Sequence, residues 1–311
     1  MSLKRKIWEL TPMPVINFYR RVKSFYLTFY RDLLVCYFPK IAVKRQYKLC
    51  FGVFPDLKDP KTINEKLQVL KLGEYYNNRL VSDCIDKYKV KDLLVNHFKV
   101  SGLKIAQLYA VFDNVDELIN AGFERYPQKF VIKCNHGSGY NLLCDKRELD
   151  TAEIRKCLEK WFKEDYWKIF VEYQYRFIKK KIFIEEYLEN IGDTYKFYCF
   201  NGHPKFFYVS NPDEHGNADA YCDYFDMNFR HLDILLYGHL HSDRLISKPT
   251  CFNRLIEIAE YIAKDFPFVR VDLYVAGNDI YFSELTFIPT GGYMKLEPPK
   301  TPSEWGDLLK L

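Results

Sequence analysis

Two carboxylates lie within the apolar strands of a predicted β-hairpin near the C-terminal end of the chain. FVRVDLYV (268–275), the turn AGND and IYFSELTF (280–287) have the pattern of two buried strands joined by a short turn. Asp272 and Glu284 fall on these two strands, so a register that places them side by side would create an oxygen-lined site. Such a pair is typical of Mg²⁺ held beside a nucleotide, and it is also compatible with a solvated polar face. The hairpin predicts a β-containing fold and marks the first candidate site.

Strands and helices are predicted in mixed order along the rest of the chain. Apolar runs predict strands at 105–112, 129–134, 141–144, 181–188, 194–200 and 204–210, the last two joined by an Asn-Gly turn. Helical spacing predicts one or two short helices over 79–98, helices over 151–177 and 252–265, and one that begins near Ile63 behind the capping-box sequence TINE. This mixture predicts an α+β fold.

A lysine and a glycine-containing loop mark the tip of the hairpin predicted over 129–144. Lys133 lies near the end of the first strand, and the polar loop NHGSGYN (135–141) follows it. A lysine ammonium and closely approaching backbone amides suit a polyphosphate. The loop is not a Walker A motif, and an ordinary hairpin tip would also explain it. His136 is a further candidate contact, although a lone histidine is more often a structural hydrogen-bonding residue.

The predicted strand KIFIEEYL (181–188) ends in a polar dipeptide. Glu185 and Glu186 close the strand, and Leu188 follows two residues later. A strand that leaves a buried sheet at such a point offers backbone N–H and C=O groups to the edge of an adenine ring. An ordinary strand end at the surface accounts for the same residues, so this third candidate site stays open at the level of the sequence.

Charge and cysteine usage exclude several classes of protein. The formal net charge of +5 suits an anionic ligand without identifying one, and no nucleic-acid-binding motif is present. The nine cysteines form no CxxC pair, so they are interpreted as core residues in a reducing compartment. No apolar run reaches the roughly 18 residues of a membrane helix, and the N-terminus lacks a signal-peptide pattern. We therefore expect a cytoplasmic protein that binds no nucleic acid.

The first 50 residues form a basic, aromatic segment unlike the rest of the chain. Apolar and aromatic residues recur over 16–38 at helical spacing, with arginines and lysines between them. This pattern predicts an amphipathic helix. Such a helix would lie on an anionic membrane surface or pack against the catalytic body, and the first alternative would place residues 1–40 in peripheral contact with the inner face of the membrane.

The order of these segments resembles one family of the ATP-grasp superfamily. The resemblance to the TupA-like ATP-grasp family covers roughly residues 50–300, and KCNHGSG and YKFYCFNG are its most specific marks. It follows FPDLKDPKTINEKLQVLKL, CIDKYKVKDLL, LYAVFDNVDEL, PQKFVIKCNHGSGYNLLC, KIFIEEYL, DTYKFYCFNGHPKFFYV and VRVDLYVAGNDIYFSELTFIPTGG. The resemblance implies an ATP-grasp fold, in which two α+β lobes grip ATP. It divides the chain into an N-terminal helical segment (1–50), a pre-ATP-grasp region (51–125), a first lobe with a lid (126–190) and a second lobe with the metal site (191–311).

The resemblance also implies a role for each matching residue. The residues expected to contact ATP are Lys87, Lys133, His136, Gly137, Ser138, Gly139, Glu185, Glu186 and Leu188. Lys196 and Arg270 are expected to act at the transferring phosphoryl group or acyl phosphate, and Asp272 and Glu284 to hold Mg²⁺. Thr286 stands where the wider superfamily commonly has an asparagine. A threonine hydroxyl can still bind through water, so Thr286 is kept as a weaker metal ligand.

The function implied by the resemblance is amide formation driven by ATP. A ligase of this kind phosphorylates a carboxylate and lets an amine attack the acyl phosphate, and the family occurs in surface-polysaccharide and teichuronopeptide gene neighbourhoods. The expected partners are ATP with Mg²⁺ and a small or glycan-linked carboxylate and amine. Alternatives are a glycosyltransferase of a polysaccharide locus, a non-catalytic nucleotide-binding protein and an ATP-grasp kinase, although no DxD or GxGxxG motif supports the first.

The polar segment 211–247 has no assigned role. It contains His215, His231, His239 and His241, and it would serve acceptor recognition or form an ordinary surface insertion. His239 and His241 share a face if this stretch is a strand. No cysteine or acidic residue stands near them at the spacing typical of zinc ligands, so the sequence predicts no metal site here.

Overall fold

The computed structural model describes residues 13–189, 191–211 and 220–311, and it describes side chains almost entirely from residue 26 onwards. The chain divides into two compact units, Met1–Phe54 and Pro55–Leu311. The predicted hairpin with Asp272 and Glu284, the glycine-containing loop (135–141) and the end of the strand 181–188 all fall in the larger unit. His215 lies outside the described residues.

The smaller unit consists of two helices, α2 (Met13–Tyr37) and α3 (Pro39–Phe51). The helix predicted over 16–38 is confirmed. Pro39 occupies the first turn of α3, where its missing N–H costs nothing, and Gly52 ends the helix with a φ of 78°. Tyr26, Phe29 and Tyr37 are exposed on α2. No helix in the described part of the chain is long and apolar enough to cross a membrane.

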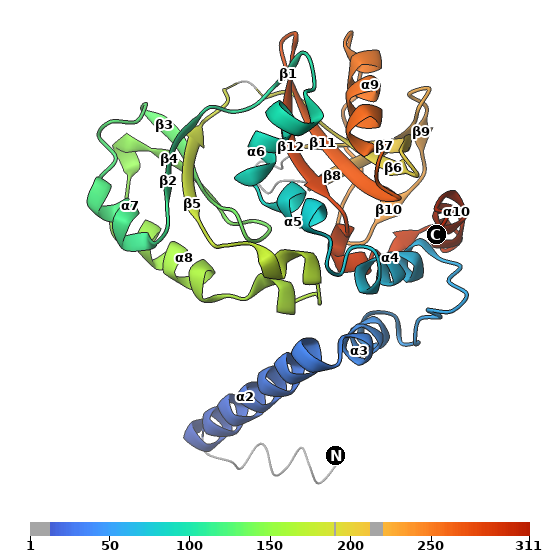
Figure 1. Cartoon of the computed structure of the whole chain (residues 1–311), viewed down its shortest axis with the longest axis horizontal. Helices are drawn as coiled ribbons and strands as arrows, with labels where there is room; N and C mark the ends of the chain where they lie inside the picture. Colours follow the sequence, from blue (N-terminus) through green and yellow to red (C-terminus); the bar gives the residue numbers. More distant parts are fainter. Residues whose placement is uncertain (1–12, 190, 212–219) are drawn as a thin grey trace. The chain divides into compact units, whose positions relative to one another are not determined.

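A seven-stranded sheet is the largest sheet of the second unit (Figure 1). Its strands, in spatial order, are β1 (Leu103–Lys104), β12 (Asp279–Thr286), β11 (Phe268–Ala276), β6 (Thr194–Phe200), β7 (His203–Asn211), β8 (Tyr221–Asp226) and β9 (His231–Leu232). Helix α9 (Phe252–Ala263) covers one face, where Leu255 and Ile258 are buried in one core cluster with Phe197, Phe207 and Val271. Both predicted hairpins, β6–β7 and β11–β12, are confirmed.

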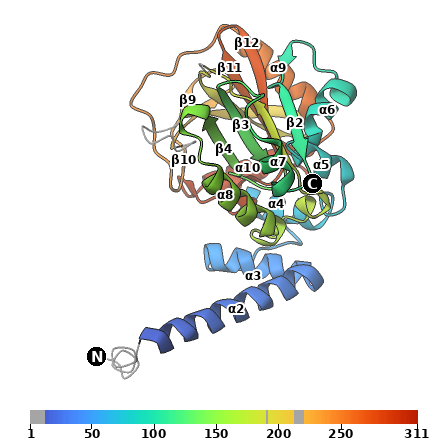
Figure 2. The ribbon, with the colours of Figure 1, turned by 90° about the vertical axis from the view of Figure 1, so that its left-hand side faces the viewer.

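A four-stranded sheet lies in the green part of the chain, with α7 and α8 beside it (Figure 2). Its order is β2 (Leu108–Phe112), β5 (Ile182–Glu186), β3 (Lys129–Cys134) and β4 (Asn141–Asp145), with α7 spanning Val115–Ala121 and α8 spanning Thr151–Lys163. Phe130, Ile132 and Ile184 share a core with both helices. Because side chains alternate along a strand, Lys133 and Glu185 project from the opposite face.

The remaining elements of the second unit lie outside these two sheets, and β10 and β13 pair with each other. They are α4 (Ile63–Leu72), α5 (Arg79–Ile85), α6 (Lys89–Asp92), the π-helix η1 (Leu93–Phe98), the 3₁₀ turns η2 (Lys146–Glu148), η3 (Tyr166–Lys168), η4 (Tyr173–Phe177) and η5 (Pro289–Gly292), the short strands β10 (Leu235–Leu236) and β13 (Leu296–Glu297), and α10 (Thr301–Leu308). The predicted capping box is present, because the side chains of Thr62 and Glu65 bond to each other's backbone N–H. It fixes the start of α4.

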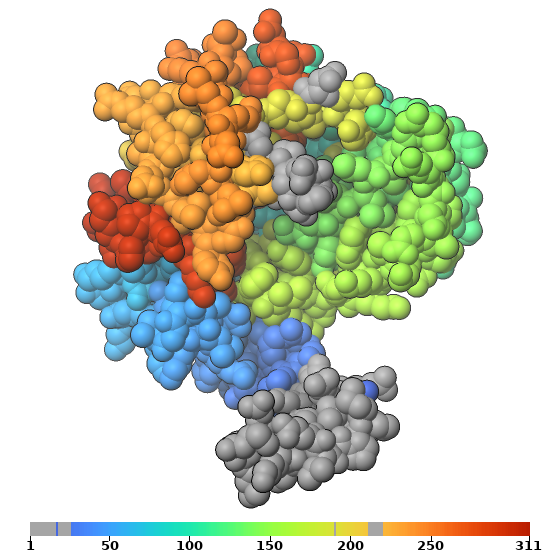
Figure 3. Space-filling model, turned by 180° about the vertical axis from the view of Figure 1, so that it is seen from behind, coloured from blue at the N-terminus to red at the C-terminus, as the bar shows by residue number. Residues whose placement is uncertain are grey.

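The segment from β8 to α9 contains little regular structure. Beyond β8 it forms only the two-residue strands β9 and β10. The golden-orange part of the space-filling view shows this segment on the molecular surface (Figure 3). Within 211–247, β8 is therefore followed by an irregular surface stretch, and His239 and His241 lie outside any strand.

Candidate active site

The register of three central strands brings the predicted metal and phosphoryl residues onto one face. In the β11–β12 pair, Asp272 lies opposite Glu284 and Arg270 lies opposite Thr286. On the other side of β11, Asp272 lies opposite Lys196 of β6. Residues that are partners in adjacent strands point to the same side of a sheet. The strand pairing therefore assembles five side chains from the β11–β12 hairpin and from β6, which is distant from that hairpin in sequence.

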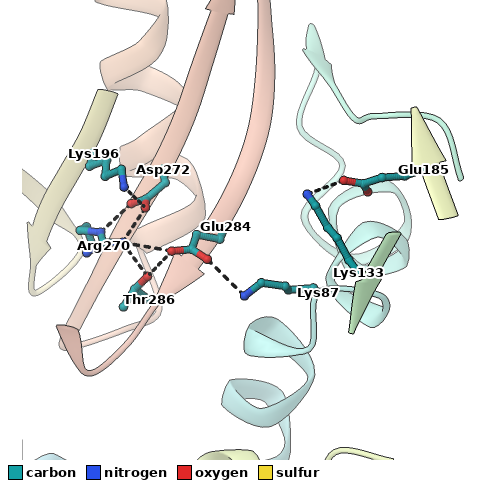
Figure 4. Close-up of polar contacts among 8 residues, drawn as sticks. All are labelled: Lys87, Lys133, Glu185, Lys196, Arg270, Asp272, Glu284 and Thr286. Carbon is teal, nitrogen blue, oxygen red and sulfur yellow. Dashed lines mark hydrogen bonds and ion pairs between the residues drawn. The ribbon is translucent and has the colours of Figure 1, made fainter. Parts of the chain in front are cut away.

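Arg270 lies at the centre of this arrangement and bridges both carboxylates (Figure 4). Its Nε lies 2.7 Å from Asp272 Oδ1 and its Nη2 lies 2.6 Å from Asp272 Oδ2, a two-pronged pairing. The same Nη2 donates to Glu284 Oε1 at 3.1 Å and to Thr286 Oγ1 at 3.0 Å. Lys196 Nζ lies 3.8 Å from Asp272 Oδ2. The network holds two carboxylates and a hydroxyl within reach of one guanidinium.

Lys87 reaches this network from the connection between α5 and α6. Its Nζ lies 3.3 Å from Glu284 Oε2, a contact that joins positions 197 residues apart (Figure 4). Burial alone would raise the pKa of Glu284, but the positive charges of Lys87, Arg270 and Lys196 outweigh it and lower this pKa to about 2. Glu284 is therefore ionised at neutral pH and available as a hard oxygen ligand.

Asp272 lies deeper than Glu284, and its pKa shifts the other way. Complete burial raises the pKa of Asp272, and Arg270 and Lys196 offset part of that rise. The pKa of Arg270 is raised well above its usual range, since the attraction of Asp272 outweighs burial, which alone would lower it. The two-pronged pairing with a permanently charged guanidinium favours the ionised form of Asp272.

A second cluster surrounds Glu185 on the four-stranded sheet. Glu185 is buried and forms ion pairs with Lys133 and, at 2.7 Å, with Lys91 (Figure 4 shows the first). Burial would raise the pKa of Glu185, but the two lysines lower it. Burial lowers the pKa of Lys91, whereas the pKa of Lys133 is raised because Glu185 and other nearby groups outweigh burial. One buried carboxylate therefore holds two cations.

Lys91 is a residue that sequence reasoning missed. Besides Glu185, its Nζ contacts the carbonyl oxygen of Ala106 at 2.9 Å. The available signal was its spacing, because Lys87 and Lys91 stand four residues apart within the helical stretch predicted over 79–98, a spacing that would place them on one side of a helix. Tyr208 was missed as well. Its ring lies under both Lys196 and Arg270, with the charged atoms 5.5 and 5.8 Å from the ring centroid.

The predicted lid loop is anchored at its base and exposed at its tip. Asn135 is buried, donates to both carboxyl oxygens of Asp86 at 3.0 Å and accepts from the Lys181 N–H at 2.8 Å. Ser138 and Gly139 are exposed. The loop thus has an exposed tip on a fixed base, and its role as a lid over phosphates stays a prediction.

The ring of His136 is buried beside Tyr140 and Phe162 in the part of the chain that carries the loop. It is 3% exposed, and its Nε2 lies 3.0 Å from the carbonyl oxygen of Trp161. Burial lowers the pKa of His136 to about 4, so the ring is neutral at pH 7. The described contacts are those of a structural hydrogen-bonding histidine, and a nucleotide contact of His136 stays a prediction.

The predicted adenine-binding strand end is only partly free to bind. The Glu186 N–H donates to the Gln107 carbonyl at 2.9 Å, and Glu186 Oε2 accepts from the Gln107 N–H at 3.1 Å. Leu188 lies just beyond β5 and is half-buried. Any backbone pairing with a purine would therefore involve the carbonyl of Glu186 or groups nearer Leu188, and their contact with adenine stays a prediction.

The donor set on β11 and β12 fits a magnesium ion. Mg²⁺ prefers carboxylate oxygens, usually keeps several waters and is held together with substrate phosphates. Asp272 and Glu284 supply such oxygens from neighbouring strand positions, and Thr286 Oγ1 lies 3.3 Å from Glu284 Oε1. Cationic side chains outnumber carboxylates across both clusters, which suits an anionic ligand such as a nucleotide.

Comparison with known proteins gives one extensive match. The sequence profile of the TupA-like ATP-grasp family matches residues 65–310. No curated protein matches the chain in sequence.

Solved structures of ATP-grasp ligases are similar at low identity. D-alanine–D-alanine ligase from Helicobacter pylori aligns at 17% identity and a TM-score of 0.42, over 73% of this chain and 61% of that one. The enzyme from Bacillus anthracis complexed with ATP aligns at 19% and 0.39, over 67% and 57%. N5-carboxyaminoimidazole synthetase from Staphylococcus aureus aligns at 15% and 0.37, over 73% and 52%. The chain thus spans less than two thirds of each of these proteins.

Proposed function

Because the chain belongs to the TupA-like ATP-grasp family, we propose that it is an ATP-dependent carboxylate–amine ligase that works through an acyl phosphate. ATP-grasp enzymes use ATP with Mg²⁺. The observation that carries the proposal is the network in which Arg270 joins Asp272 and Glu284 while Lys87 and Lys196 approach from other segments. Paired carboxylates surrounded by lysine and arginine are the groups that bind and neutralise a metal–polyphosphate.

Each side chain has a role in this proposal. Asp272 and Glu284 hold the metal, with Thr286 contributing directly or through water, and Arg270 and Lys196 neutralise charge at the transferring group. Bound Mg-ATP supplies a phosphoryl group that activates the substrate carboxylate. These residues need supply little covalent chemistry, since their work is to align the reactants and to stabilise charge.

The two lysines on Glu185 suggest how Lys133 becomes available to phosphate. A buried carboxylate that loses its only partner costs several kcal/mol, about 3–5 for a buried pair. Glu185 has a second partner in Lys91, 2.7 Å away, so Lys133 can turn to a phosphate oxygen while Glu185 stays paired. In this proposal Lys133 and Lys87 bind the phosphates, and Lys91 acts as a positioning residue that never leaves Glu185.

The loop between β3 and β4 would exclude water from the reaction. Gly137, Ser138 and Gly139 cover the phosphates, and the bonds of Asn135 to Asp86 fix the base of the loop. An acyl phosphate hydrolyses readily in water, so a cover over it protects the amide-forming step. Glu185, Glu186 and Leu188 frame the adenine, mainly through backbone groups.

The proposed substrates are a carboxylate and an amine of cell-surface polysaccharide synthesis, of the capsular or teichuronic type. This part rests on the gene neighbourhoods that the family resemblance implies. A uronic acid or amino acid would supply the carboxylate, and an amino acid or amino sugar the amine.

The test is ADP release from Mg-ATP with uronic acids, amino acids and amino sugars, offered singly and in pairs. ADP formed only when a carboxylate and an amine are both present supports the ligase. ADP together with a stable phosphorylated carboxylate or sugar would identify a kinase instead. No ADP with any pair, but a nucleoside diphosphate released from a nucleotide sugar, would identify a glycosyltransferase.

We also propose that residues 1–40 touch an anionic membrane surface at the inner face of the membrane. Tyr26, Phe29 and Tyr37 are 63%, 60% and 72% exposed on α2, and basic residues lie between the aromatic positions of the helix. The full-length protein should float with vesicles that contain phosphatidylglycerol. Flotation should fall when Tyr26 and Phe29 are replaced by serine, and equal binding to uncharged vesicles would contradict an electrostatic contribution.

A further inference from the structure

Two histidines and an aspartate converge at a point outside the proposed active site. Asp223 lies on β8, His231 on β9 and His241 in the stretch that follows β10. His231 Nε2 lies 3.2 Å and His241 Nδ1 lies 3.1 Å from the same oxygen, Asp223 Oδ1. One ligand atom from each residue lies within 4.8 Å of the others.

The spacing of residues in 211–247 did not indicate this cluster in the sequence. The residues stand at irregular spacing in the sequence, and their convergence depends on the antiparallel pairing of β8 with β9 and on the bridge between Tyr221 and Leu240. Spacing rules for zinc ligands describe local motifs and miss a site that strand pairing assembles.

The separations of the two histidine nitrogens from Asp223 Oδ1 agree with ligands of one metal ion. Bonds of about 2.0–2.2 Å from zinc to nitrogen or oxygen place neighbouring ligand atoms roughly 3.0–3.5 Å apart in octahedral or tetrahedral geometry. The two nitrogen–oxygen separations, 3.1 and 3.2 Å, lie in that interval. The other carboxyl oxygen, Asp223 Oδ2, accepts from the Ser242 N–H at 3.1 Å, which leaves Oδ1 as the oxygen directed at the imidazoles.

The donor types and their exposure indicate which ion would bind. Two imidazole nitrogens and one carboxylate oxygen suit Zn²⁺ and other divalent first-row transition metals, whereas Mg²⁺ and Ca²⁺ prefer oxygen ligands alone. The Asp223 side chain is 5% exposed, while those of His231 and His241 are 47% and 34% exposed. An ion at this point would rest on a buried carboxylate and remain open to solvent, so water can complete its coordination.

The cluster lies on the opposite face of the sheet from the proposed magnesium site. Across the strands, Asp272 lies opposite Lys196, which lies opposite Tyr208. Asp223 lies opposite Val209, one residue further along β7, and therefore points to the other face. A metal bound here would be separate from the one expected on β11 and β12.

We propose that Asp223, His231 and His241 form a binding site for a divalent transition-metal ion of the zinc type. The ion would fasten the irregular stretch after β8 to the sheet. Backbone bonds already hold one point of this stretch, since the Cys222 N–H donates to Leu240 at 2.8 Å and the Leu240 N–H donates to Ala220 at 3.0 Å. Coordination would add metal bonds at His231 and His241 to the strand pairing of β8 with β9 and to the Ser242 contact with Asp223.

The test is Co²⁺ titration of the full-length, chelator-treated protein in excess Mg²⁺, which occupies oxygen-only sites. We expect one Co²⁺ per chain, with the visible spectrum of nitrogen and oxygen ligands, no thiolate charge-transfer band and displacement by Zn²⁺. His231→Gln, His241→Gln and Asp223→Asn should each weaken binding at least about tenfold. His203→Gln is the matched control, because His203 is an exposed histidine elsewhere, paired with Glu260, and should leave the titration unchanged.

A second measurement keeps the test decisive if a variant is less stable. Added Zn²⁺ should raise the thermal unfolding midpoint of the wild-type protein and of His203→Gln, and should leave that of folded Asp223→Asn unchanged. Absence of tight Co²⁺ binding in the wild type would overturn the proposal. So would a thiolate band that marks a cysteine site, or affinity and Zn²⁺ stabilisation that persist in the three ligand variants.

Discussion

Replacing Lys91 by methionine tests the proposed exchange of partners at Glu185. In the wild type, Lys133 can leave Glu185 for a phosphate because Lys91 remains 2.7 Å away. In Lys91→Met, the same movement would leave a carboxylate that is 6% exposed without a cation. ATP binding and the neutralisation of Glu185 would then compete for the single remaining lysine.

The size of the effect follows from the contact that is lost. A hydrogen bond to a charged group contributes about 1.5–3 kcal/mol, and a middle value of about 2 kcal/mol corresponds to roughly a 30-fold weaker Kd for ATP. The full cost of about 3–5 kcal/mol for a broken buried pair is an upper limit, because Lys133 can return to Glu185 between binding events. Isothermal titration with a non-hydrolysable ATP analogue and Mg²⁺ measures this Kd directly.

Two further variants separate this mechanism from direct contact between Lys91 and ATP. Lys91→Met combined with Glu185→Gln removes the stranded charge and should recover most of the lost affinity. Lys89→Met is the matched control, since Lys89 lies in the same short helix but pairs with Asp83 at the surface. Unchanged affinity in Lys91→Met, or no recovery in the double variant, would refute the reasoning.

Three other predictions concern the site and its lobes. Asp272→Asn and Glu284→Ala should abolish Mg-ATP turnover in folded protein, whereas Asp279→Asn, on an exposed part of the same hairpin, should not; full activity in the first two would refute the metal assignment. The lowered pKa of Glu284, about 2, means that its ion pairs stabilise the fold above its ordinary pKa of 4.5 and lose that contribution as pH falls towards 2. Urea midpoints between pH 5 and 2.5 should therefore fall less steeply in Glu284→Gln than in the wild type, and parallel curves would contradict this. Gly137→Ala should lower the free energy of unfolding by about 1–3 kcal/mol, because its new Cβ would overlap the ring of Tyr140, and an unchanged urea midpoint would show that the loop relaxes freely.

Local sequence patterns were sufficient to predict most of the secondary structure near the site. The alternation in FVRVDLYV and IYFSELTF predicted both strands and placed Asp272 and Glu284 on them, and the structure adds the register that puts them side by side. TINE predicted the start of α4 through its capping box. These patterns depend on residues close together in the sequence, so they can be interpreted without knowledge of the tertiary fold. The predicted TupA-like ATP-grasp family and α+β fold are likewise confirmed.

What could not be predicted depends on contacts between distant segments. The pairing of Lys91 with Glu185 joins a short helix to a strand of the four-stranded sheet. The convergence of His231 and His241 on Asp223 depends on how an irregular stretch folds back onto β8. Neither contact can be read from the sequence, because a pair of side chains on two distant elements constrains a single residue in each element and leaves no repeating pattern.

The role of Arg270 could be predicted from its chemistry, whereas its contacts could not. A charge-neutralising role was predicted for it, but its geometry was not. Its guanidinium contacts Asp272, Glu284 and Thr286 at once, so it organises the same carboxylates that are proposed to hold Mg²⁺. A metal at this site would share these oxygens with Arg270, which couples metal binding to the position of the guanidinium.

The most direct test of the central claim follows the oxygen atoms of the substrate. Once ADP release has identified an active carboxylate–amine pair, the carboxylate is supplied with both oxygens as ¹⁸O and the inorganic phosphate is analysed by mass spectrometry. Activation through an acyl phosphate transfers one carboxylate oxygen to phosphorus, and attack by the amine releases that oxygen in phosphate. The account therefore predicts one ¹⁸O atom in each phosphate formed. Unlabelled phosphate from a reaction that yields amide and ADP would contradict it.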